Sequence, residues 1–153
     1  MQRFGPLCAA LVLLVVLGGC QTTGRQPQVR QAQITPSDLK PGDTAVITIE
    51  IADKYGIVDR VEGVVREDPR IKFKLRDDGI EPDKKARDGV WTLQVDVPFQ
   101  APPGQFTLEF TAFRSDGQPV IVRDKEGNAV PLTGSFNMVI RYPDAPQEKS
   151  GSK

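Results

Sequence analysis

Residues 104–114 read GQFTLEFTAFR, and their side chains alternate between apolar and polar. The apolar positions are Phe106, Leu108, Phe110 and Ala112. Successive side chains of a β-strand point to opposite faces, so a period of two is typical of a strand with one buried face. This stretch therefore predicts a strand that packs on a hydrophobic core and turns its threonines and glutamate to water.

The same alternation recurs on both sides of this stretch. Clear runs cover 43–53, 70–76, 89–98 and 134–142, and weaker runs cover 29–35, 57–66 and 119–123. Turn signals such as Pro102-Pro103-Gly104 and Ser115-Asp116-Gly117 separate them. Seven to eight short strands with one apolar face each predict an all-β fold, an immunoglobulin-like antiparallel β-sandwich over residues 29–142. A small closed barrel is the alternative.

Composition and charge exclude several classes of function. The 153 residues carry 20 basic and 20 acidic side chains, so no excess of positive charge predicts a nucleic-acid partner. Histidine is absent, which removes the commonest general base and the usual nitrogen ligand of metals. The two cysteines, Cys8 and Cys20, both lie near the N-terminus and cannot staple the fold. We therefore predict that the protein is not an enzyme and needs no cofactor.

The N-terminus has the pattern of an export signal. Residues 1–20 read MQRFGPLCAALVLLVVLGGC, in which Arg3 precedes an apolar run over 7–17 and small residues follow. That run is shorter than the roughly 20 residues that span a bilayer. A buried helix or a short membrane anchor is the alternative. We predict that residues 1–19 are a signal peptide.

Leu17-Gly18-Gly19-Cys20 resembles the lipobox of bacterial lipoproteins. The resemblance implies a diacylglyceryl group on the Cys20 sulfur, cleavage just before Cys20, and acylation of the new amine, with palmitate as the expected chain. Two or three acyl chains hold a protein on a membrane durably, whereas one does not. Gln21 follows the cysteine where an aspartate would imply retention at the inner membrane.

These features predict where the protein resides. We expect a lipid-anchored protein of the cell envelope, at the outer membrane and facing the periplasm or the surface if the source is Gram-negative. Residues 20–28 are polar and are predicted to form the lipidated N-terminus and a flexible tether. Residues 143–153 are predicted to form a disordered tail, because they are polar and hold no large apolar side chain that could pack on the domain.

An acidic loop of about a dozen residues interrupts the strands. Residues 75–93 read LRDDGIEPDKKARDGVWTL. Ca²⁺ takes six to eight oxygen ligands, and the candidates here are Asp77, Asp78, Asp83 and Asp88. The alternative is turn chemistry, in which aspartates accept hydrogen bonds from backbone N–H groups and Gly79 and Gly89 adopt positive φ. Counted from Asp78, Gly89 stands where an EF-hand has glutamate, so turn chemistry is favoured and no metal is assigned.

This segment also resembles a bacterial immunoglobulin-like module of surface proteins and lipoproteins, of the choice-of-anchor X type. The resemblance covers residues 44–117 and is carried by an acidic pair with glycine, then an aspartate, then Asp-Gly before an aromatic residue. Here these are Asp77, Asp78, Gly79, Asp83, Asp88, Gly89 and Trp91. Pro82 and Arg87 stand where that family often has glycine. The resemblance implies an immunoglobulin-like fold.

Two other features are candidate binding sites. Trp91 alternates in phase with Leu93 and Val95, which favours core packing over a role in stacking a ligand. Lys72, Lys74 and Arg76 form a basic stripe that is either a solvated face or a contact for an anionic envelope polymer.

We therefore predict a non-catalytic, membrane-anchored lipoprotein that presents its immunoglobulin-like module to a protein or an envelope polymer. The alternative is an accessory lipoprotein that holds Ca²⁺ or a glycan at the 77–89 loop.

Overall fold

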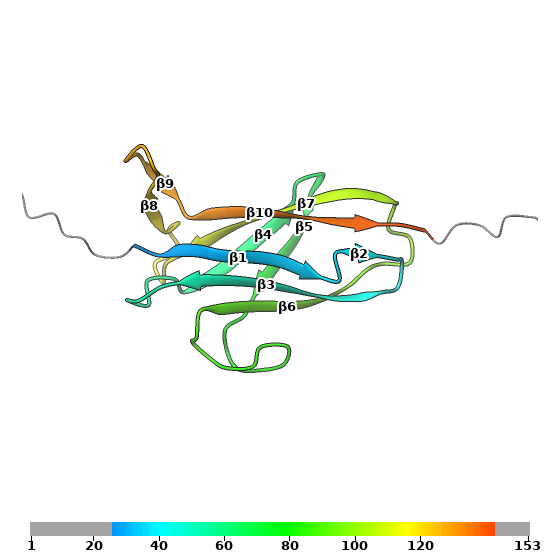
Figure 1. The fold of residues 1–153 in the computed structure, drawn as a ribbon, viewed down its shortest axis with the longest axis horizontal. Helices are drawn as coiled ribbons and strands as arrows, with labels where there is room; N and C mark the ends of the chain where they lie inside the picture. Colours follow the sequence, from blue (N-terminus) through cyan, green and yellow to red (C-terminus); the bar gives the residue numbers. More distant parts are fainter. Residues whose placement is uncertain (1–25, 143–153) are drawn as a thin grey trace, which may run out of the picture.

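Residues 26–142 are described by a computed structural model, and every regular element within them is a β-strand (Figure 1). The predicted signal peptide, the lipid site at Cys20 and the predicted tail over 143–153 lie outside the described residues. Among the residues that are described, no helix has the length and apolar character needed to cross a membrane.

The strands form two main sheets. One sheet has the order β1-β3-β6, with β1 (Gln28–Thr35), β3 (Thr44–Ala52) and β6 (Val90–Asp96). The other has the order β2-β10-β7-β4-β5, with β2 (Asp38–Leu39), β10 (Thr133–Ile140), β7 (Gly104–Phe113), β4 (Arg60–Val65) and β5 (Asp68–Leu75). A separate hairpin joins β8 (Ile121–Arg123) to β9 (Ala129–Pro131).

The core lies between the two main sheets. Alternate residues of β3 and β7 are buried, namely Ala45, Ile47, Ile49, Ile51, Leu108, Phe110 and Ala112. Trp91 of β6 pairs with Ile49 and is also buried, as its phase predicts. The prediction of an all-β fold with packed antiparallel sheets is thus confirmed. Only the short contact of β2 with β10 is parallel in the main sheets.

Two glycines leave room for aromatic rings within the larger sheet. A Cβ placed on Gly63 of β4 would lie 2.6 Å from Cε2 of Phe73, and a Cβ on Gly134 of β10 would lie 2.7 Å from Cε1 of Phe110. Carbon atoms do not approach so closely, so each ring lies over bare backbone of the neighbouring strand. These glycines are therefore fixed by packing.

The alternation in the sequence does not predict two of the strands. β2 and β9 have two and three residues, which are too few for alternation to show. β2 is held by the backbone, because Val139 N–H donates to Ser37 O at 2.9 Å and Arg141 N–H donates to Leu39 O at 2.8 Å. The described chain thus has ten strands where seven or eight are predicted.

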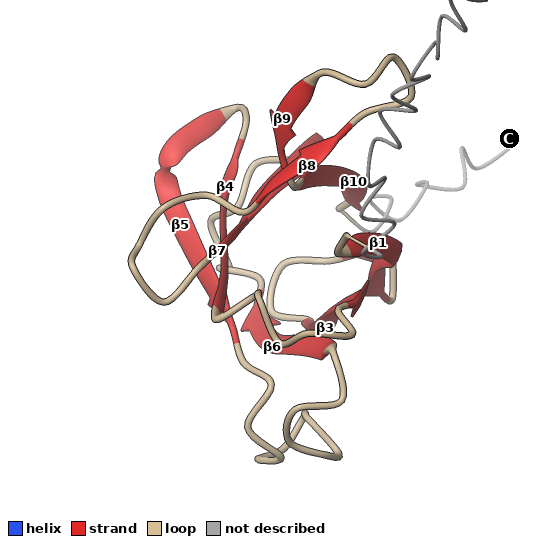
Figure 2. Cartoon of the chain, turned by 90° about the vertical axis from the view of Figure 1, so that its left-hand side faces the viewer, coloured by secondary structure: helices blue, strands red, loops and turns tan. Residues whose placement is uncertain are grey.

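The strands β5 and β6 are the outer strands of different sheets, and they meet at one end. Arg76 N–H donates to Thr92 O at 2.9 Å, and Thr92 N–H donates to Arg76 O at 2.8 Å. No further pairing joins β5 to β6 within residues 26–142. Figure 2 shows the strands around the interior, with the connection from β5 to β6 extending below the body. The two sheets therefore separate on this side, toward Ile71 and Val97.

Candidate functional site

The aspartates of the 77–89 loop are used to close the loop. Asp77 accepts hydrogen bonds from the backbone N–H groups of Asp88 at 3.1 Å and Gly89 at 3.0 Å. This contact ties the start of the loop to its end. Gly89 has φ of +83°, and a Cβ on it would lie 2.5 Å from Ile51 O, so the closed loop needs glycine there.

Asp83 lies at the centre of this loop, and only 2% of its surface is exposed. Its carboxylate accepts hydrogen bonds from the N–H groups of Gly79 at 2.6 Å and Lys85 at 3.2 Å. The Gly79 N–H, followed by other backbone N–H groups, holds the pKa of Asp83 below its ordinary value despite the opposing effect of burial. Asp83 is therefore an internal anchor of the loop.

The turn interpretation explains all four predicted aspartates. Asp78 and Asp88 accept from the N–H groups two residues further on, Ile80 and Val90, each at 3.0 Å. Carboxylate oxygens of Asp77, Asp83 and Asp88 lie within 4.8 Å of one another, and loop closure accounts for that approach. We assign no metal to this cluster.

We expect Asp83→Asn to lower the melting temperature at neutral pH, because an amide places a donor against backbone donors. A lowered pKa in the folded state gives stability that is present above the ordinary pKa of 3.8 and is lost as the pH falls through the folded value. The difference between variant and wild type should therefore shrink below about pH 4. Thermal melting across pH measures it, with the exposed Asp59→Asn as the control. A difference that does not change with pH would contradict this role.

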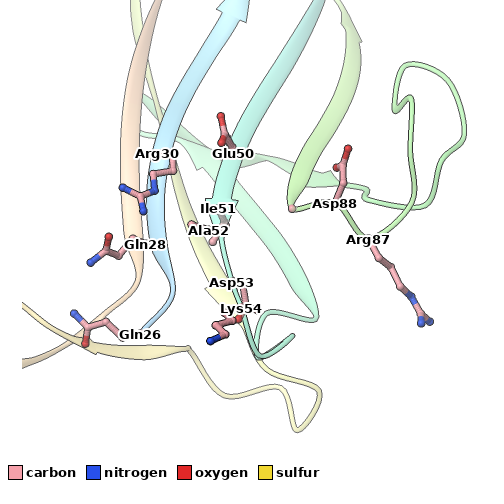
Figure 3. A pocket seen from close by; sticks show the side chains of 11 residues that line it. Gln26, Gln28, Arg30, Glu50, Ile51, Ala52, Asp53, Lys54, Arg87 and Asp88 are labelled. Carbon is pink, nitrogen blue, oxygen red and sulfur yellow. The ribbon is translucent and has the colours of Figure 1, made fainter. Parts of the chain in front are cut away.

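A polar depression of about 650 Å³ lies where β1 begins and β3 ends (Figure 3). Its lining mixes charges of both signs, among them Arg30, Glu50, Arg87 and Asp88. Arg87 points away from the others in Figure 3, so these side chains do not converge on one point. Arg87 also has φ of +58°, a backbone conformation that favours glycine over residues with a side chain. We assign no ligand to this depression.

An apolar cavity of about 620 Å³ occupies the space where β5 and β6 separate. Both sheets line it with aliphatic and aromatic side chains: Ile47, Val65, Phe73, Leu93, Val95, Val97, Phe106, Leu108, Met138 and Ile140. The turn from β6 to β7 closes one side with Pro98, Ala101 and Pro102. Polar residues of the lining are Lys72, Lys74, Asp96 and Gln100.

The chemistry of this cavity is that of a binding site for an apolar group. Ligand pockets are usually concave, largely apolar and roughly 300–1,000 Å³ in volume. Among the described residues, Asp96 is the one acid of its lining, and it accepts a hydrogen bond from the Thr44 hydroxyl at 2.7 Å. These lining residues include no pair of acids and no nucleophile with a base. The arrangement therefore offers burial of apolar surface.

Sequence reasoning missed this cavity, because its residues carry the same alternation as the packed core. Periodicity shows which face turns inward but not whether another sheet fills the space opposite. Ile71 shares a predicted face with Phe73 and Leu75 yet is 54% exposed at the cavity, which the alternation does not reveal. One signal in the sequence is the proline-rich turn over 98–103, which closes one side of the cavity.

No family model matches the chain. Over 106 residues it is 28% identical to a phosphatidylglycerol/phosphatidylinositol transfer protein of Aspergillus oryzae, covering 60% of this chain and 58% of that protein. The chain thus spans a little over half the length of this relative.

A solved structure of Pseudomonas fluorescens alkylpurine DNA glycosylase AlkC bound to DNA containing an abasic site analog matches with a TM-score of 0.45 and 11% identity. It covers 76% of this chain and 30% of that one.

Proposed function

We propose that this chain is a non-catalytic, lipid-anchored module of the cell envelope that holds an acyl chain between its two sheets. The apolar cavity between β5 and β6 is the observation that carries the proposal. The cavity is open where β5 and β6 separate, so an acyl chain can enter between the two sheets without unfolding them.

Two further points support this proposal. The Aspergillus relative is named for transferring phosphatidylglycerol and phosphatidylinositol, both of which carry acyl chains. The lipobox resemblance at Cys20 supports a location beside a membrane, where such lipids are at hand. A module anchored there needs only burial of apolar surface to bind its ligand.

A second candidate function is the contact with a protein or an envelope polymer that the sequence predicts. One observation favours it, since within residues 26–142 the strands β5 and β6 each leave one edge without a partner over most of their length. An extended peptide could add to such an edge through backbone hydrogen bonds. Calcium or a glycan at the 77–89 loop has less support, because the backbone already engages its aspartates.

We expect Val95→Trp to weaken binding of the apolar dye N-phenyl-1-naphthylamine roughly tenfold, since displacing about two buried methylenes costs about 1.6 kcal/mol. Val95 faces the cavity from β6. Fluorescence titration of the full chain measures the affinity. Val46→Trp is the matched control, because Val46 pairs with Gln94 on the other face of the same sheet.

Wild-type protein that leaves the dye unbound would overturn the proposal, as would equal affinities of the two tryptophan variants. Native mass spectrometry of protein purified from its membrane should in addition show a mass of bound lipid beyond that on Cys20.

A further inference from the structure

We propose that the rim of the apolar cavity docks on a bilayer rich in anionic phospholipid, so that an acyl chain passes from the bilayer into the cavity without crossing water. This inference rests on the proposed function. It adds a surface, a partner and a route to the cavity.

The rim carries exposed large apolar side chains. Phe99 is 78% exposed, Ile71 is 54% exposed and Tyr142 is 49% exposed. Ile71 lines the cavity, and Phe99 lies in the turn whose neighbours Pro98 and Gln100 line it. Aromatic and aliphatic side chains that project from a surface in this way partition into the interface of a membrane.

The rim is held in place by hydrogen bonds and packing. Gly42 N–H donates to Val97 O at 2.9 Å, and Ala101 N–H donates to Pro98 O at 3.0 Å. The Phe99 ring lies against Gly42, where a Cβ would be 2.6 Å from its Cε1. The Tyr142 hydroxyl donates to Ala101 O at 3.0 Å. The apolar groups are therefore presented by a fixed turn, which lowers the entropy lost on docking.

The charged groups that line the cavity carry a net positive charge, with Lys72 and Lys74 against Asp96. Lys72 and Lys74 line the cavity from β5, and neither belongs to the ion pairs found within residues 26–142. They also border a shallow depression together with two acids. Both acids are engaged elsewhere: Glu62 with Arg60 at 3.1 Å, and Glu109 with Arg66 at 2.6 Å. The two lysines are thus left to attract anionic headgroups.

The same charges argue against a second copy of the chain as the occupant. A twofold dimer places one patch against the same patch of its partner. Such a contact made through this rim would bring Lys72 and Lys74 of both copies together, and like charges disfavour it. An anionic bilayer provides both an apolar phase for Phe99 and Ile71 and negative charge for the lysines.

The test follows loading of the full chain from phosphatidylcholine vesicles that contain NBD-labelled phosphatidylglycerol. Phe99→Ser should slow loading about tenfold, whereas Ile80→Ser, which removes a similarly exposed side chain (58%) on the 77–89 loop, should not. The double variant Lys72→Glu/Lys74→Glu should slow loading about tenfold, and Lys84→Glu/Lys85→Glu is its matched control. All variants keep the same N-terminus, so the affinity of the anchor for the vesicles contributes equally to every loading rate and does not affect the comparison between variants.

The outcomes separate this inference from the proposed function. Dye binding in solution should stay within about twofold of wild type in Phe99→Ser, Ile80→Ser and Lys84→Glu/Lys85→Glu, because none of these residues lines the cavity. Lys72 and Lys74 do line it, so the loading rate of Lys72→Glu/Lys74→Glu is compared with wild type after correction for the dye affinity of that variant. If Phe99→Ser binds the dye normally and loads lipid as fast as the wild type, the docking inference is wrong and the proposed function stands. If the wild type does not bind the dye, the proposed function is wrong. If Phe99→Ser converts a dimer to a monomer in light scattering, the rim joins copies of the chain and the docking inference is wrong.

Discussion

Phe110→Ala should lower the free energy of unfolding by about 3–5 kcal/mol, which is typical for removal of a buried phenylalanine. Phe110 is 2% exposed at the centre of β7, and its ring lies 6.5 Å from that of Phe136. Its neighbour Gly134 has no side chain with which to fill the space. The cavity left by alanine therefore stays open.

Urea denaturation followed by the fluorescence of Trp91, the single tryptophan, measures this loss. Phe99→Ala is the matched control, because Phe99 is largely exposed and should lose less than about 1 kcal/mol. Equal losses in the two variants would contradict the placement of Phe110 in the core. The free energy of unfolding of a domain is commonly about 5–15 kcal/mol, so Phe110→Ala should be close to unfolding at 37 °C.

Gly63→Ala should cost about 3 kcal/mol, at the upper end for an added methyl group in a packed site. The new Cβ would collide with the ring of Phe73 and with the backbone carbonyl oxygen of Glu109. The ring can turn aside, but the carbonyl belongs to β7 and is held in the sheet. The collision must therefore displace a strand.

Gly127→Ala serves as the control for this variant. Gly127 has φ of +87° and no atom near its added Cβ, so alanine there meets backbone strain alone and should cost about 1–2 kcal/mol. Adding Phe73→Ala to Gly63→Ala should recover only part of the loss due to the methyl group, because the clash with Glu109 remains. Full recovery would show that the ring alone resists the methyl group.

The sequence predicts most of the fold because alternation records burial directly. β3, β6 and β7 fall within clear runs and β4 falls within a weaker one, whereas β10 and β1 each begin one residue before the runs that predict them. β2 forms only because it pairs with β10, and no local pattern in the two residues of β2 predicts that pairing. β5 begins two residues before its predicted start, at Asp68, where a register shift lets Val65 pair with that residue.

The candidate site was predictable only in part. The 77–89 loop shows its chemistry locally, since an aspartate and the N–H two residues later are close in any chain. The apolar cavity depends instead on two sheets diverging from the Arg76–Thr92 contact, which joins segments at opposite ends of a loop. Alternation assigns Val95 and Phe106 to the interior, and only the three-dimensional packing shows that the interior there is unfilled.

β1 and β10 run in the same direction, so the start of β1 and the end of β10 lie at opposite ends of the body (Figure 1). Tension applied through these ends would act along the strands rather than across them. Several rungs of the β1–β3 and β7–β10 ladders would then have to break together, which resists a pull better than breaking them one by one. The placement of the two ends therefore predicts that the domain resists a pull along its strands better than a pull across them.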